Sequence, residues 1–248
     1  NDNIALGQNA GRATGSGAKQ DNIFIGQDTG KNLVASQGEI LIGHQTGKEI
    51  NTSYATNLGI GFQAFPSATT SKYTIALGYR AGFSLSTGIK NLCIGLFAGQ
   101  NNITTGSNNI CIGYNADASS TSASNEITLG DSNIATLRCN VQTISSLSDG
   151  RDKTNVTDLP EGLEFINKLR PVKFEWKTRE RSTKTGYEAG FIAQDLQLTQ
   201  KETETEYLKL VMDSNPDRLE ASYGKLVPIL VKAIQELTIE INKLKSNV

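Results

Sequence analysis

The stretch NLCIGLFAG at residues 91–99 is one of eight copies of a single pattern, and these copies decide the fold of the first half of the chain. Their shared glycines recur every 17 to 19 residues, from Gly7 to Gly130. A fixed period of this kind is the signature of a repeat architecture. The other copies are NIALGQNAG (3–11), NIFIGQDTG (22–30), EILIGHQTG (39–47), NLGIGFQAF (57–65), TIALGYRAG (74–82), NICIGYNAD (109–117) and EITLGDSNI (126–134).

Each copy opens with the alternation of a short strand. The second and fourth residues are mostly Ile or Leu, with a small or variable residue between them, which is typical of a half-buried strand. The glycines that follow let the chain turn sharply in every copy. Because one copy has too few apolar residues for a core, stability must come from stacked copies or associated chains. We expect an elongated β-stack whose core is shared between the protomers of a parallel homotrimer.

The two halves of the chain differ in composition. Residues 1–147 hold 19 of the 24 glycines but 16 of the 49 charged residues, which leaves 5 glycines and 33 charges for residues 148–248. This contrast predicts a mainly β repeat stack, as in a trimeric fibre, followed by an α+β domain that ends in a long coiled-coil helix. The predicted bounds are 1–140 for the repeats, 141–147 for a linker and 148–248 for the second domain.

Composition also argues against several classes of partner. A net charge of -1 offers no basic field for nucleic acid, and no long apolar run predicts membrane insertion. The three cysteines lack zinc-site spacing, and Cys93 and Cys111 occupy the same interior-type position in successive copies, so we expect reduced thiols and no metal. No cofactor is expected. Residue 1 falls inside a repeat motif, which indicates a fragment of a longer protein.

The repeats offer few candidate sites. No GxGxxG lies between a strand and a helix, and no GK[ST] is present, so the glycines are interpreted as structural. Acidic residues are too sparse for the carboxylate pair of a glycosidase. Aromatic residues that are candidates for stacking on sugars or receptor loops, although such residues more often belong to a core, are Tyr54, Phe62, Phe65, Tyr79, Phe83, Phe97 and Tyr114.

The second domain has recognisable elements. Asp158-Leu159-Pro160-Glu161 predicts a helix start, and Arg170-Pro171 predicts the end of that helix. Strands are expected over 172–176 and 186–192, with a short helix beginning over 194–198. A heptad pattern over 223–244 predicts a coiled coil, against the alternative of an amphipathic helix packed on its own domain. Tyr223 shares one heptad position with Leu230, and the predicted trimerisation residues are Val227, Leu230, Ile234, Leu237, Ile241 and Leu244.

Four linked motifs in this domain resemble the intramolecular chaperone auto-processing domain, a self-cleaving serine peptidase family. They are SDGRDK (148–153), GLEFINKLRPVKFEW (162–176), GFIAQ (190–194) and YGKLVPILVKAIQEL (223–237). The family occurs at the C-termini of phage tail fibres, tailspikes and endosialidases, and in a membrane-bound transcription factor of animals. The resemblance implies a trimeric chaperone that folds the upstream β-fibre and then cuts itself free.

The resemblance places the cleaved bond between Leu147 and Ser148, with Ser148 and Lys153 as the catalytic pair. The only histidine, His44, lies in the repeats, so inventory excludes a Ser-His-Asp triad within the second domain. A Ser-Lys pair requires a neutral amine, which burial or nearby cations favour. The five-residue spacing lets Ser148 and Lys153 meet only through a turn or across the trimer.

Candidates for supporting roles are Asp149, Arg151 and Gln194. Asp149 is a candidate to orient the lysine or to cap the turn, Arg151 and Arg170 to lower the pKa of the base, and Gln194 to donate to the oxyanion; ordinary structural roles are the alternative. The favoured function is a phage tail fibre segment with an autoproteolytic chaperone, in the virion and assembled in the host cytoplasm. The alternative is an adhesin that binds a host receptor or glycan and keeps an uncleaved trimerisation tip.

Overall fold

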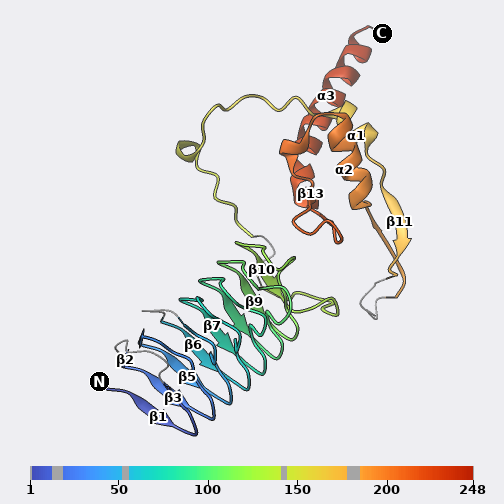
Figure 1. Cartoon of the computed structure of the whole chain (residues 1–248). Helices are drawn as coiled ribbons and strands as arrows, with labels where there is room; N and C mark the ends of the chain where they lie inside the picture. Colours follow the sequence, from blue (N-terminus) through green and yellow to red (C-terminus); the bar gives the residue numbers. More distant parts are fainter. Residues whose placement is uncertain (1, 13–18, 52–55, 141–143, 178–184, 248) are drawn as a thin grey trace. The chain divides into compact units, whose positions relative to one another are not determined.

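The chain divides into two compact units, Asn1–Ile134 and Ala135–Val248 (Figure 1). The predicted domain bounds at 140 and 147 stay predictions, and positions 141–143 of the predicted linker lie outside the described residues. The computed structural model describes residues 2–12, 19–51, 56–140, 144–177 and 185–247.

The first unit is a parallel β-solenoid, which confirms the predicted repeat stack. Figure 1 shows its strands stacked as successive rungs, one per repeat. Eight strands pair in parallel in chain order: β1 (Ile4–Leu6), β3 (Ile23–Ile25), β5 (Ile40–Ile42), β6 (Leu58–Ile60), β7 (Ile75–Leu77), β8 (Leu92–Ile94), β9 (Ile110–Ile112) and β10 (Ile127–Leu129). A smaller parallel pair joins β2 (Lys19–Gln20) to β4 (Ser36–Gln37).

The core of the solenoid closes within a single chain, which corrects the expectation of a core shared between protomers. The middle residue of each inner strand points inward, as Phe24, Leu41 and Cys93 do. Residues outside the nine-residue motif complete the interior. They include Leu33, Ile50, Leu85 and Ile103, each with no exposed surface. Counting the apolar residues of the motif alone gave too low a number for one coil. The four residues just named lie in the variable part of the repeat, outside the motif.

A column of glycines lets successive coils approach closely. Gly61 has a φ of +142°, and a Cβ placed on it would lie 2.3 Å from the carbonyl oxygen of Gly78 in the next coil. Any side chain here would collide with backbone, which cannot swing away. The recurring glycine is therefore a steric requirement of the stack.

A second column, which we call the asparagine ladder, precedes the strands. Its buried members hydrogen-bond from coil to coil: Asn57 Oδ1 accepts from the N–H of Thr74 at 2.9 Å, and Asn91 Oδ1 accepts from the N–H of Asn109 at 3.0 Å. Because buried backbone groups must be paired, these side chains replace strand pairing at the start of each rung. The ladder consists of Asn22, Glu39, Asn57, Thr74, Asn91 and Asn109.

The second unit is the predicted α+β domain with a long terminal helix. Its elements are η1 (Gly150–Asp152), α1 (Leu163–Lys168), β11 (Val172–Glu175), β12 (Tyr187–Gly190), α2 (Ala193–Glu202), η2 (Glu206–Leu208), β13 (Val211–Met212), β14 (Glu220–Ala221), η3 (Tyr223–Lys225) and α3 (Leu226–Ser246). The strands form two antiparallel pairs, β11 with β12 and β13 with β14. The first helix starts later than predicted, after Gly162, and ends before Pro171 as predicted.

A small core holds this unit together. Phe165 of α1 packs with Leu210, and with Leu226 and Ile229 of α3. The carboxylate of Glu236 on α3 accepts a hydrogen bond from the backbone N–H of Leu163 at 2.7 Å, so α3 satisfies the first turn of α1. Across the described part of the chain, no helix combines the length and apolar character needed to cross a membrane.

Candidate functional site

The predicted cleavage site lies on an exposed, extended segment. All described residues from 144 to 158 are exposed, and Leu147 is fully so. The first half-buried residue of the compact body is Leu159. Within this segment the only regular structure is the single turn η1. A peptide bond presented in this way is accessible from all sides in one chain.

The turn brings Ser148 and Lys153 together. Lys153 Nζ donates to Ser148 Oγ at 2.5 Å and to the carbonyl oxygen of Ser148 at 3.2 Å. A strand or a helix would separate side chains five residues apart, and the 3-10 turn Gly150–Asp152 folds the backbone so that they meet within one chain. The contact therefore does not require a second protomer.

Asp149 caps this turn and pairs with Arg151. Its carboxylate accepts from the backbone N–H of Arg151 at 2.9 Å and from the guanidinium at 2.6 Å. These hydrogen bonds from Arg151 hold the pKa of Asp149 below its usual value. Of the two roles considered for Asp149, the structure provides the cap. Among the described residues, no carboxylate forms an ion pair with Lys153.

Two other residues that were considered for a role in catalysis are Arg170 and Gln194. Arg170, considered as a cation near the base, forms an ion pair with Asp195 of α2 at 2.7 Å. Gln194, considered as an oxyanion donor, is exposed in the first turn of α2. No hydrogen bond joins Gln194 to Ser148 within the described ranges. Its proposed catalytic role therefore has no geometric support in a single chain.

Three of the four motifs, over 162–176, 190–194 and 223–237, meet in the folded body of the second unit. The N–H of Phe191 donates to the hydroxyl of Tyr223 at 3.0 Å, and the two rings contact edge to face at 5.6 Å. Arg170 and Asp195 connect the second motif with the residue after the third. Glu236 connects the fourth motif with the start of α1. These contacts join the three motifs into one folded unit.

Helix α3 has one buried face and, next to it, an exposed apolar face. Leu226, Ile229 and Ala233 are buried against the body of the unit. The predicted trimerisation residues are instead exposed on the single chain, by 41% for Leu237 to 68% for Leu244. We call this exposed row the heptad seam: Val227, Leu230, Ile234, Leu237, Ile241 and Leu244.

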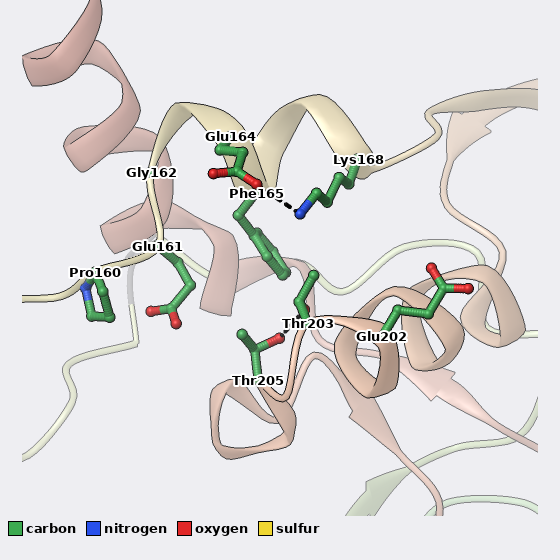
Figure 2. Close-up of a pocket in the computed structure, with 9 residues that line it drawn as sticks. All are labelled: Pro160, Glu161, Gly162, Glu164, Phe165, Lys168, Glu202, Thr203 and Thr205. Carbon is green, nitrogen blue, oxygen red and sulfur yellow. Dashed lines mark hydrogen bonds and ion pairs between the residues drawn. The ribbon is translucent and has the colours of Figure 1, made fainter.

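A shallow pocket beside α1 is shown in Figure 2. Phe165 forms its floor, while the ion pair of Lys168 with Glu164 crosses its rim at 2.9 Å. The lining is mixed and open to solvent, without a convergent set of polar groups. Its residues are Pro160, Glu161, Gly162, Glu164, Phe165, Lys168, Glu202, Thr203 and Thr205.

The aromatic residues of the repeats that were considered for ligand binding differ in whether they are buried in the core or lie in a row outside it. Phe65 is fully buried in the core, and Tyr54 lies outside the described residues. Phe62 and Tyr79 stack on each other at 5.3 Å, and the row continues through His44, Phe97 and Tyr114. We call these five residues the aromatic row. The motif glycine precedes most members, and this spacing is the sequence signal for the row.

The solenoid, the exposed Ser-Lys turn and the heptad seam define a repeat-stack protein whose C-terminal domain carries an exposed apolar row on its last helix. Residues 148–203 match the peptidase family described as chaperone of endosialidase, so this part of the chain is an intramolecular chaperone domain of that family. The match supports a chaperone role of the tail fibre or tailspike kind. It begins at Ser148 and does not extend to the repeats. No curated protein and no solved structure matched the chain significantly.

Proposed function

We propose that this chain is a phage tail fibre segment whose C-terminal unit joins three copies, assists folding of the repeats and then releases itself by cutting Leu147–Ser148. The observation that carries the proposal is the 2.5 Å hydrogen bond between Lys153 and Ser148 at the first residue of the family match. The fibre is then a component of the virion, assembled in the host cytoplasm.

The cleavage chemistry uses this chain's own residues. Lys153, as a neutral amine, removes the proton from Ser148 Oγ, and the oxygen attacks the carbonyl carbon of Leu147. The C–N bond breaks, and the lysine returns the proton to the leaving nitrogen of Ser148. The product is an ester between the acyl group of Leu147 and Ser148 Oγ. Water hydrolyses that ester, leaving a carboxylate on Leu147 and a free amine on Ser148.

In the proposed trimer, neighbouring chains would exclude water from the Ser-Lys pair, which a single chain does not do. The Ser-Lys pair is exposed to water in one copy, and water favours the charged form of an amine. Burial of the turn between neighbouring copies would favour the neutral amine. This requirement makes cleavage follow assembly, which is the order that a chaperone needs.

Intact mass spectrometry of the purified chain tests the cleavage. We expect two fragments, residues 1–147 and 148–248, whereas Ser148→Ala and Lys153→Met give only the full-length mass. Asp152→Asn is the matched control, because it alters the same turn without touching the pair, and it should still cleave. Cleavage of Ser148→Ala at the same bond would refute the mechanism.

Folding assistance is tested separately with the uncleaved Ser148→Ala chain. After dilution from denaturant, recovery of native β-structure should depend on protein concentration, since three chains must meet. The variant Ser148→Ala/Ile234→Glu, with a charge in the heptad seam, should recover poorly. Equal recovery of both chains at every concentration would remove the chaperone role.

A second candidate function is favoured by the aromatic row. Exposed Phe62, Tyr79 and Tyr114, joined through Phe97, form a row suited to a host receptor or glycan, with the C-terminal unit kept as a permanent tip. Because Phe62 and Tyr79 stack at an interplanar angle of 7°, their faces already contact each other. A glycan-array signal from the Ser148→Ala chain that disappears on Tyr114→Ala would favour this alternative.

A further inference from the structure

The outer face of the eight-stranded sheet carries two unbroken columns of aliphatic side chains. The first and third residues of every strand point away from the core, and the printed register aligns each with its equivalents in the neighbouring coils. We call them the aliphatic strip: Ile4, Ile23, Ile40, Leu58, Ile75, Leu92, Ile110, Ile127 and Leu6, Ile25, Ile42, Ile60, Leu77, Ile94, Ile112, Leu129.

The composition of the strip is not explained by the fold of one chain. All sixteen positions are Ile or Leu, yet none belongs to the buried core of the solenoid. Strand propensity favours Ile, but it equally favours Thr, Val and Tyr, none of which occurs at these positions. A strand face in contact with water ordinarily carries polar side chains, and a continuous apolar surface on a soluble chain marks an interaction site.

The spacing of the side chains along the strip indicates which partner binds to it. Neighbouring strands lie about 4.8 Å apart, so seven intervals span roughly 34 Å. A partner that contacts every rung must present apolar groups with the same repeat over the same length, or it drifts out of register. A second copy of this chain, aligned in parallel, meets that condition at all eight strands. Its own strip supplies uncharged aliphatic groups opposite each rung.

We infer that the aliphatic strips of parallel copies pack against one another, in register, around the axis of the assembled fibre. Three residues at about 3.3 Å each make the strip roughly 10 Å wide. Its projected area of roughly 340 Å² is below the 800 Å² or so per partner of a stable interface. The strip alone is therefore too small to hold copies together, and the inference relies on the heptad seam as well. The copy number and the parallel orientation rest on the trimer of the proposed function.

Site-specific cross-linking of the full chain tests this packing. In a Cys139→Ser background, Cys93 and Cys111 are buried, so an introduced cysteine is the only exposed thiol. Ile40→Cys places it on the strip in β5, the third strand from one end of the sheet. Parallel, in-register copies bring equal residues together, so a short bismaleimide should join two chains through residue 40. An antiparallel arrangement would separate them.

The matched control is Asn51→Cys, which is exposed on the same coil outside the strip and should stay uncross-linked. Sedimentation of each sample separates the possible failures. A trimer in which Ile40→Cys does not cross-link, or in which Asn51→Cys cross-links equally, overturns the strip packing alone. A chain that sediments as a monomer at all concentrations overturns both this inference and the proposed trimer.

A second variant measures the contribution of the strip. Ile60→Lys/Ile75→Lys adds two charges to its centre, on side chains that are 42% and 37% exposed in one chain, so the fold itself should survive. We expect trimer dissociation at a concentration at least tenfold higher than for the unaltered chain. Leu198→Lys, at an exposed apolar residue of α2, is the control and should change nothing. Equal dissociation of the two variants contradicts the inference.

Discussion

The two units of this chain bury apolar side chains in different ways. In the solenoid, Leu41 pairs in register with Phe24 and Gly59 of the neighbouring coils, and most side-chain hydrogen bonds between coils span 14 to 19 residues. In the C-terminal unit, the bond from Leu163 to Glu236 spans 73 residues. The solenoid therefore gains stability coil by coil, whereas the C-terminal unit must close long loops before it gains any.

The same contrast applies to the surfaces left exposed. The aliphatic strip repeats once per coil, and the heptad seam repeats every three to four residues along α3. A coil that is not yet stacked cannot present a strip, because the strip exists only after several rungs have formed. The seam exists as soon as one helix has formed. Association through α3 can therefore begin before the repeats are ordered, which is the order that a chaperone requires.

The strongest test of this contrast is a charge in the seam. In the proposed trimer, Ile234→Glu would place three carboxylates side by side, and each unpaired buried charge costs several kcal/mol. We expect the trimer to be lost, with an effect on the order of 5–10 kcal/mol per trimer, and the fold of a single chain to survive. Analytical ultracentrifugation and circular dichroism measure the two effects.

Gln235→Glu is the control for that variant. Residue 235 is exposed beside the seam, so the same charge there should leave the trimer intact. A trimer that survives Ile234→Glu would show that association does not depend on α3.

The next effect concerns the glycine column. In Gly61→Ala, the new Cβ would lie 2.3 Å from the backbone oxygen of Gly78, in a conformation with φ of +142°. Strain and overpacking together should lower the free energy of unfolding by about 3–5 kcal/mol. Urea unfolding of the repeats measures the loss. Gly150→Ala, where no atom lies within 4 Å, should stay within about 0.5 kcal/mol of wild type.

Sequence reasoning found the stack, because a period of 17 to 19 residues with Ile/Leu alternation leaves few other folds. It did not find how the coil closes, since Leu33, Leu85 and Ile103 lie among polar loop residues, outside the motif that recurs. It gave no role to the asparagine ladder, because a polar residue before a strand resembles any loop residue. Only the register shows that Asn91 is buried between coils.

The sequence predicted only part of the candidate site, because some of its contacts are local and others join distant segments. Ser148 and Lys153 were found through a family motif, and the turn that joins them follows from local sequence. The partners of Arg170 and the position of Gln194 depend on how distant segments pack. No local pattern encodes that Arg170 faces Asp195, 25 residues away.

Glu39 makes the stability of the stack depend on pH. It occupies an asparagine-ladder position, is fully buried, and accepts hydrogen bonds from the backbone and side chain of Asn57. Burial raises its pKa to about 8. The folded chain therefore holds a proton that the unfolded chain loses near pH 4.5, so stability falls as pH rises from about 4.5 to about 8.

Glu39→Gln should remove the loss of folding stability that occurs as the pH rises. Above pH 8 the variant should be more stable than wild type by on the order of 1–3 kcal/mol, and near pH 4 the two should agree. Thermal unfolding at several pH values measures the difference. Glu126→Gln is the control: the carboxylate of Glu126 accepts from the N–H and hydroxyl of Ser119, so the substitution should bring no gain. Identical pH profiles for wild type and Glu39→Gln would mean that Glu39 is not protonated in the fold.

The smallest effect is expected in the segment between the two units. Asp149 holds Arg151 through exposed hydrogen bonds, and exposed ion pairs contribute little to global stability. Asp149→Asn should leave both unfolding transitions unchanged, while the amide of Arg151 exchanges its hydrogen roughly two- to fivefold faster because the cap is weakened. NMR-detected exchange measures this. If an unfolding midpoint moved instead, the segment would have to pack against a folded unit in the assembled protein, and the Ser148–Lys153 turn would then be buried there, as cleavage by a neutral lysine requires.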